Sequence, residues 1–106
     1  MLETKIDIEW NETLKPRHHN QVIMIVEKNE KREIKYFEDV RSNNEFCNDA
    51  AKYLVEQRID TSNGINKMTH KLYDNEFVNP LVSEDVHTEH YIMKRIIEQV
   101  EKIKQE

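Results

Sequence analysis

The stretch Val22-Ile23-Met24-Ile25-Val26 decides the fold of this chain, because every side chain in it is apolar. Its valines and isoleucines are branched at Cβ, which favours extended backbone over helix. A strand without a polar position is typical of the middle of a sheet, where both faces are covered and both edges are paired. We therefore predict a central strand at residues 22–26 with one neighbour on each side.

Two neighbouring strands are predicted before and after this stretch. Residues 2–10 alternate between apolar and polar side chains, which is the period of a strand with one buried face. Residues 11–20 contain a proline and are predicted to form a loop. The polar residues 28–31 predict a hairpin turn into a third strand at residues 33–40. In that strand Ile34, Tyr36 and Val40 share the face that we expect to point toward the helices.

Two helices are predicted after the strands. Ser42 and Glu45 match a capping box, in which each side chain satisfies a free amide at the start of a helix. This helix should end near Ile59, before Gly64, which can adopt a left-handed conformation. A final helix is expected from a cap at Ser83 nearly to Gln105, with acidic residues in its first turn.

The segment between the helices, residues 65–82, carries a mixed signal. Ile65, Met68 and Leu72 have helical spacing, whereas Met68, His70 and Leu72 alternate as in a strand. We favour a short helix and keep an irregular insert as the alternative. The predicted fold is therefore α+β, a three-stranded antiparallel meander followed by two main helices packed on one face, in a single domain of residues 1–106.

Composition limits the classes of protein to which the chain can belong. Of its 106 residues 35% are charged, and its net charge of −5 disfavours non-specific binding to nucleic acid. No apolar run approaches the roughly 20 residues that a membrane helix requires, and the N-terminal residues lack the apolar core of a signal peptide. Cys47 is the only cysteine, so no internal disulfide can form. These features predict a cytoplasmic protein without membrane contact.

No motif for catalysis or cofactor binding is recognisable in the sequence. We therefore predict that the protein is not an enzyme and holds no cofactor and no metal. His87 and His90 lie one helical turn apart, but a third ligand such as His70 or a carboxylate is needed for a zinc site. Metal or ligand binding through histidines is kept as an alternative. Cys47 lies on the apolar stripe of the first helix, where a small thiol packs rather than reacts.

One candidate partner-binding surface is the side of the sheet that faces away from the helices. If Ile34 and Tyr36 point toward the helices, Phe37 points away from them. The all-apolar central strand then sends either Ile23 and Ile25 or Val22, Met24 and Val26 to the same open side, and we take Ile23 and Ile25 as the candidates. An apolar spot ringed by charge is typical of a protein-binding surface, unless the segment between the helices folds over it.

A second candidate surface is the apolar stripe of the final helix. It consists of Met93, Ile96, Ile97, Val100 and Ile103, of which we take all but Ile97 as candidate contact residues. Covering the sheet is the main role that we expect for this stripe. Pairing of two chains into a homodimer through the C-terminal helix is the alternative.

These surfaces favour a non-catalytic domain that binds another protein. The abundance of Asn, Lys, Ile and Glu is typical of an AT-rich bacterium or its phage, so we expect a small inhibitor or regulator of a bacterial host protein. In size, acidity and strand-strand-strand-helix order the chain resembles some anti-CRISPR inhibitors, although no motif residue carries the resemblance. A further alternative is a nucleic-acid-associated factor or a mimic of nucleic acid. The candidate residues for mimicry are Glu3, Asp7 and Glu9 on one face of the first strand, where Lys5 interrupts the row.

Overall fold

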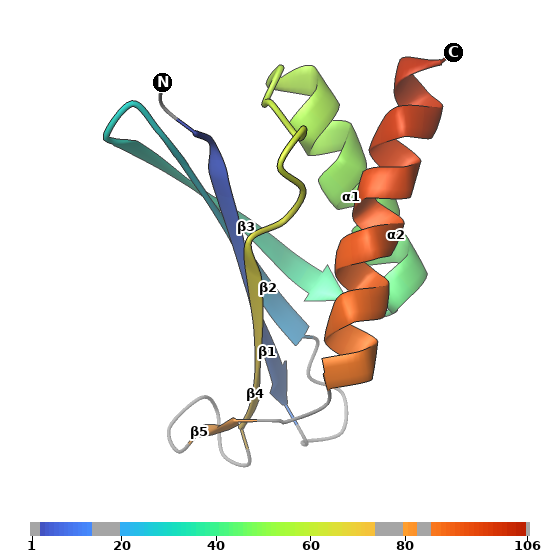
Figure 1. Cartoon of the computed structure of the whole chain (residues 1–106). Helices are drawn as coiled ribbons and strands as arrows, with labels where there is room; N and C mark the ends of the chain where they lie inside the picture. The colour runs from blue at the N-terminus through green and yellow to red at the C-terminus, as the bar shows by residue number, and fades with distance from the viewer. Residues whose placement is uncertain (1–2, 14–19, 74–79, 83–85, 106) are drawn as a thin grey trace.

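A mixed sheet and two helices form the two layers of this protein (Figure 1). The computed structural model describes residues 3–13, 20–73, 80–82 and 86–105. The elements follow in the order β1 (Lys5–Thr13), β2 (Asn20–Lys28), β3 (Lys31–Val40), α1 (Asn43–Glu56), β4 (Lys67–Tyr73), β5 (Pro80–Val82) and α2 (Val86–Lys104). The predicted α+β class is confirmed.

The predicted central strand lies inside the sheet, whose strand order is β3-β2-β1-β4-β5. β2 is antiparallel to both β1 and β3, so the three-stranded meander is confirmed. β1 runs on to Thr13, although a loop was predicted from Asn11 onward. Its polar end is extended because Asn11, Glu12 and Thr13 pair with β4, a neighbour that the local sequence does not reveal.

The segment between the helices forms strands, so the predicted short helix is wrong. β4 lies parallel to β1, with Ile8 opposite Met68 and Trp10 opposite His70, and β5 pairs antiparallel with β4. The amide of Asn66 donates to the carbonyl of Ile6 at 2.8 Å, which ties the chain to β1 just before β4 begins. The alternation of residues 68–72 was therefore the correct signal. It prevails because β1 offers an unpaired edge to a second strand.

α1 begins where the sequence predicts. Ser42 is its N-cap, and the Ser42 hydroxyl accepts a hydrogen bond from the amide of Glu45 at 3.1 Å. One face of the helix enters the core through Phe46, Cys47, Ala50, Ala51 and Leu54. The predicted apolar stripe thus orients α1 on the sheet.

α1 ends at Glu56, earlier than the predicted end near Ile59. The amides of Arg58 and Ile59 donate to carbonyls three and five residues back, at 3.1 and 3.0 Å. This pattern is a Schellman motif, and its left-handed position is Arg58, with φ of 55°, where glycine is usual. Gly64 is left-handed as predicted, with φ of 70°, but in a separate turn.

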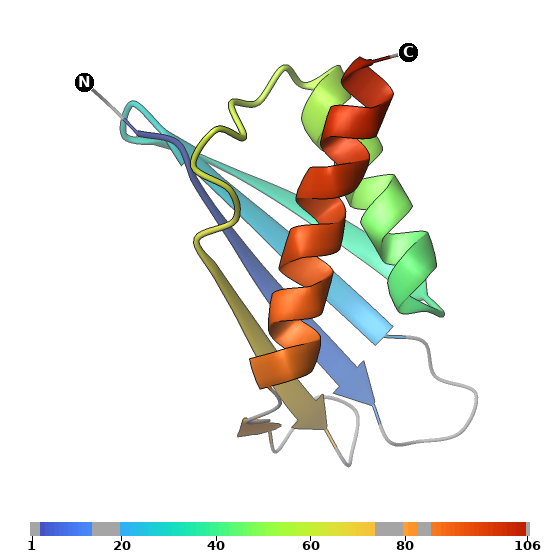
Figure 2. The ribbon, with the colours of Figure 1, turned by 45° about the vertical axis from the view of Figure 1, so that its right-hand side comes forward.

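α1 and α2 cover the same face of the sheet (Figure 2). The predicted cap of α2, Ser83, lies outside the described residues. Between the layers lies one apolar core, to which β1, β2, β4, α1 and α2 all contribute fully buried or nearly fully buried side chains. None of the helices in the described part of the chain is long and apolar enough to cross a membrane.

Candidate interaction surface

The two faces of β2 have different surroundings. Val22, Met24 and Val26 point toward the helices and are buried, whereas Ile23 and Ile25 point to the other side and are only partly buried. Because side chains alternate along a strand, an all-apolar strand in a sheet with one helical layer must present apolar side chains on its open face. The predicted placement of Ile23 and Ile25 agrees with this arrangement.

Ile34 and Tyr36 lie on the open face of β3, so their predicted orientation toward the helices is wrong. Tyr36 pairs with Ile23, and Ile34 pairs with Ile25, and paired residues of neighbouring strands share a face. Ile34 is 48% exposed and Tyr36 is 54% exposed. We call the four side chains that meet here the open-face patch: Ile23, Ile25, Ile34 and Tyr36.

Phe37 points toward the helices, which corrects its predicted place on the open face. Its ring lies 5.3 Å from that of Phe46 and 6.2 Å from that of Tyr53, both edge to face. The prediction failed because of a β-bulge. Phe37 stands opposite Val22 and Val40 stands opposite Asn20, so β3 has one more residue than β2 between these pairs. Counting alternate positions back from Val40 therefore assigns the wrong face.

Charged side chains surround the open-face patch. At the hairpin end, Arg32 Nε lies 3.5 Å from Glu27 Oε1. On β1, Asp7 stands opposite Ile25, and Glu9 stands opposite Ile23. The patch therefore has an apolar centre and a charged margin, in which the acids Asp7, Glu9 and Glu27 outnumber the bases Lys5 and Arg32.

The acids of β1 do not form a continuous row of negative charge. Lys67 on β4 stands opposite Asp7, and the side-chain amide of Asn66 donates to Asp7 Oδ1 at 2.9 Å. Lys5 interrupts the row within β1, as the sequence indicates. These cations and donors neutralise part of the charge that mimicry of nucleic acid requires.

The stripe of α2 is part of the core. Ile96 and Val100 are 0% exposed, and Met93 and Ile103 are partly buried against the same cluster. This placement matches the main role expected for the stripe, covering the sheet. In this fold Ile96 and Val100 are not accessible to a second chain.

A histidine from the middle of β4 and a carboxylate near the carboxyl end of β1 lie close together. His70 Nε2 lies 3.7 Å from Glu12 Oε2, beside a cavity of about 260 Å³. The sequence could not suggest this pair, because it depends on the parallel register of β1 and β4. Within the described residues no three His, Cys, Asp or Glu side chains are placed to hold a metal ion. The predicted ligand His87 has a side chain outside the described part.

Cys47 has the properties of a packing residue. It is 1% exposed, and its Sγ lies 3.8 Å from the carbonyl oxygen of Ile92. Burial raises the pKa of the Cys47 thiol to about 11, an effect that Arg95 partly offsets. The thiol is therefore protonated at neutral pH, as a side chain that only packs should be.

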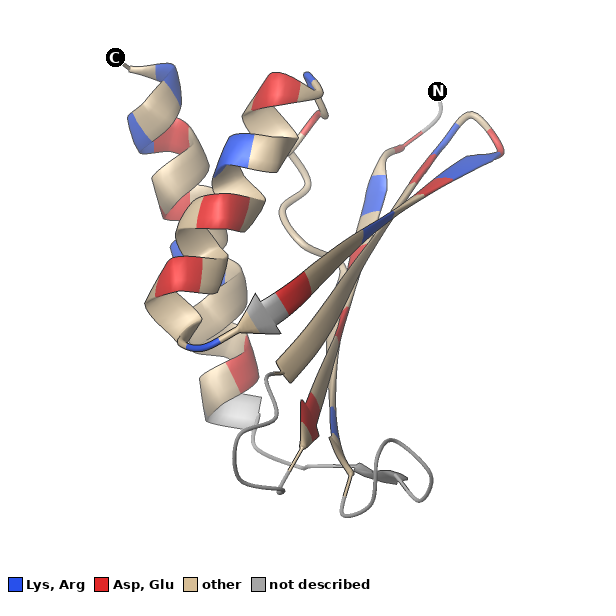
Figure 3. Cartoon of the chain, turned by 180° about the vertical axis from the view of Figure 1, so that it is seen from behind, with Lys and Arg blue, Asp and Glu red and all other residues tan. Residues whose placement is uncertain are grey.

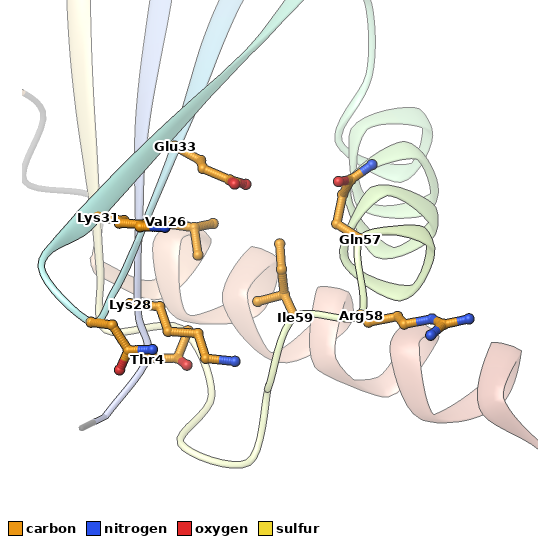
Figure 4. A pocket seen from close by; sticks show the side chains of 9 residues that line it. Thr4, Val26, Lys28, Lys31, Glu33, Gln57, Arg58 and Ile59 are labelled. Carbon is orange, nitrogen blue, oxygen red and sulfur yellow. The ribbon is translucent and has the colours of Figure 1, made fainter. Parts of the chain in front are cut away.

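A separate cleft of about 290 Å³ lies between the β2-β3 hairpin and the end of α1 (Figure 4). Val26 and Ile59 point toward one another across it, and Arg58 extends away from it. Lys28 and Glu33 add charges of opposite sign from the hairpin. This cleft has apolar walls and mixed charge, without a set of groups that converge on one point.

Comparison of the chain with models of protein families, with curated proteins and with solved structures found no match. The function therefore has to be inferred from the geometry of the described residues. Among these sites the open-face patch combines the largest exposed apolar side chains with a charged margin.

Proposed function

We propose that this protein is a non-catalytic interaction domain that binds another protein through the open-face patch. The observation that carries this proposal is the pairing of Ile23 with Tyr36 and of Ile25 with Ile34 on the face that the helices leave uncovered. Of the three exposed large apolar side chains among the described residues, Ile34 and Tyr36 both belong to this patch. Exposed apolar side chains that are contiguous favour burial against a partner.

The margin of the patch indicates the chemistry of the partner. Glu27, Asp7 and Glu9 border the apolar centre, and Arg32 is the base nearest to it at the hairpin end. A complementary surface has an apolar projection for the centre and basic side chains around it. Because rim charges act mainly on the association rate, we expect binding to become slower at high salt.

We extend the proposal to an inhibitor or regulator of a bacterial protein, as the composition suggests. A small domain with one docking face can act by occupying a surface that its partner needs. The partner's activity should then fall in proportion to the fraction bound. An unchanged activity at saturation would limit the protein to a binding role.

Tyr36→Asp and Tyr91→Asp test the docking face as a matched pair, because Tyr36 and Tyr91 are both 54% exposed and Tyr91 lies on α2. Tagged wild-type and variant chains are used to capture partners from a lysate of a low-GC bacterium, and captured proteins are quantified by mass spectrometry. We expect a partner that wild type and Tyr91→Asp retain and that Tyr36→Asp loses by at least about tenfold, since a charge replaces a desolvated aromatic contact.

Circular dichroism and a thermal melt establish that both variants are folded before capture. A partner retained equally by Tyr36→Asp and Tyr91→Asp contradicts binding through the open-face patch. Loss of the partner from both variants contradicts it as well, because the effect would then not depend on the face.

A further inference from the structure

β3 lies at the edge of the sheet, and no described strand pairs with its outer side. Residues 31–36 are exposed on both faces of the strand, and the hairpin that carries them diverges from the helices (Figure 1). An edge strand of this length is a template for pairing with another strand. This backbone edge includes Ile34 and Tyr36, whose side chains belong to the open-face patch, but it offers hydrogen-bonding groups rather than an apolar surface.

The register of the hairpin shows which backbone groups of β3 are free. Asn29 and Glu30 both have positive φ, 53° and 67°, and form a two-residue turn between the paired residues Lys28 and Lys31. In such a hairpin the two residues that flank the turn exchange backbone hydrogen bonds. Along an antiparallel pair, hydrogen-bonded and non-hydrogen-bonded residue pairs then alternate. The amide and carbonyl groups of Arg32, Ile34 and Tyr36 therefore point to the free edge.

We propose that this edge pairs antiparallel with β3 of a second copy of the chain, in a register centred on Ile34. Glu33 of each copy then stands opposite Lys35 of the other, on the helix side of the joined sheet. On the open side Ile34 meets Ile34, and Arg32 meets Tyr36. Every free amide and carbonyl of these three open-side residues gains a partner in the second copy.

The charges of β3 select this register over its neighbours. A register centred on Lys35 places two lysines opposite each other, and one centred on Glu33 places two glutamates opposite each other. Like charges in directly opposed positions destabilise a strand pair. The register centred on Ile34 is also complete before the bulge that follows Phe37, where β3 loses its regular geometry.

A groove next to the same edge, on the helix side of the sheet, can receive side chains of the second strand. It lies between β3 and α1, has a volume of about 380 Å³, and is floored by the rings of Phe37, Phe46 and Tyr53. Burial, together with the nearby Glu33 carboxylate, raises the pKa of Tyr53. The groove therefore combines partly buried aromatic rings with charged side chains.

The rim of this groove is acidic, and the second copy brings a base to it. α1 contributes Glu45, Asp49 and Glu56 to the rim, with Lys52 as its only base (Figure 3). In the proposed register Lys31 of the second copy stands opposite Phe37, on the helix side of the sheet. Its ammonium group can therefore approach the acids of α1.

The interface is small, so the dimer should be weak. A strand pair over residues 31–37 buries less than a standard protein interface, and we expect a Kd of about 10–100 µM. Dimerisation would place the open-face patches of two copies side by side in one sheet. The inference stands apart from the proposed function, because a partner on the open face does not require the dimer.

A charge exchange at residues 33 and 35 tests the inference. Glu33→Lys and Lys35→Glu each place like charges opposite one another, so each variant alone should dimerise at least about tenfold more weakly than wild type. An equimolar mixture of the two variants restores opposite charges and should recover the wild-type affinity. Sedimentation velocity between roughly 1 µM and 1 mM spans the expected Kd and provides the measurement.

Amide hydrogen exchange provides an independent readout in the wild-type chain. The amides of Arg32, Ile34 and Tyr36 should exchange rapidly at low concentration and become protected as the concentration rises, whereas those of Glu33 and Lys35 bond to β2 and should stay protected throughout. A wild-type chain that sediments as a monomer up to 1 mM, with rapid exchange of these three amides, overturns the proposal. Failure of the mixture to associate overturns it too.

Both variants must be folded, and thermal melts establish this first. Lys35 Nζ lies 5.7 Å from the centre of the Phe37 ring, so Lys35→Glu also removes a cation-π contact. Lys35→Gln is the matched control, because it removes that contact without introducing a like charge. Lys35→Gln should weaken the dimer less than Lys35→Glu, and an equal effect contradicts pairing with Glu33. Capture of a partner through the open-face patch should be unchanged in all of these variants.

Discussion

β2 and β3 belong to one hairpin and both contain several apolar residues, yet they serve different purposes. β2 is paired on both edges and sends Val22, Met24 and Val26 into the core, whereas β3 is paired on one edge and exposes residues 31–36. The difference lies in what surrounds each strand rather than in its β-propensity. Most of the buried side chains of the hairpin therefore belong to β2, whereas β3 keeps most of its side chains exposed.

The largest expected effect tests the two faces of β2. Met24 is 0% exposed on the helix side, and its neighbour Ile25 is partly buried on the open side. Met24→Ala should lower the free energy of unfolding by about 3 kcal/mol, because it leaves a cavity in the core. Ile25→Ala should cost roughly 1 kcal/mol, since it removes less buried area. Urea unfolding at equilibrium measures both, and equal losses would contradict the difference between the faces.

A second pair of variants applies the same comparison to β3. Phe37→Ala should lower the free energy of unfolding by about 2 kcal/mol, because it removes the edge-to-face contacts with Phe46 and Tyr53. Tyr36→Ala, one residue away on the open face, should cost less than about 0.5 kcal/mol, as surface substitutions usually do. If Tyr36→Ala proves the more destabilising of the two in the same urea experiment, the assigned orientation of β3 is wrong.

The burial of Cys47 on the helix side of the sheet also predicts that the stability of the protein depends on pH. Burial raises the pKa of Cys47 from 9.0 to about 11 in the folded chain. Between these values the unfolded chain releases a proton that the folded chain keeps, so stability is complete below pH 9 and falls as the pH rises. At pH 10 the loss attributable to Cys47 should be about 1.4 kcal/mol.

Cys47→Ala is the control for this pH dependence. Removal of the thiol costs stability at pH 7 but should make the decrease between pH 8 and pH 10 smaller than in the wild-type chain. Urea unfolding at a series of pH values gives both curves. Parallel curves would show that Cys47 is not the group that titrates.

Much of the fold follows from local signals in the sequence. The all-apolar residues 22–26 predict a central strand, the polar residues 28–31 predict the hairpin turn, and Ser42 predicts the start of α1. Each of these features depends on residues that are near one another in the chain. Alternation along the same strand also predicts that one apolar set, either Ile23 and Ile25 or Val22, Met24 and Val26, lies on the open face, but it does not decide which set.

The parts that were predicted wrongly depend on distant contacts or on one extra residue. β4 has both helical and alternating spacing, and only the unpaired edge of β1 decides between them. The faces of Ile34, Tyr36 and Phe37 were reversed because the bulge before Val40 shifts the alternation by one position. The Glu12-His70 pair required the register of two strands that are far apart in sequence. Such features appear only once the whole sheet is assembled.

The parallel pairing of β1 with β4 has a consequence for the order in which the chain folds. During synthesis on the ribosome, β1, β2 and β3 can form their hairpins from neighbouring residues, but one side of β1 stays bare until Lys67–Tyr73 has emerged. To complete the sheet, the chain must pass through α1 and then pair β4 with β1, whose residues lie about sixty positions earlier in the sequence. This pairing is slow compared with hairpin formation. In that interval the sheet has a second bare edge at β1 in addition to the edge at β3, so wrong association of nascent chains is favoured at this stage.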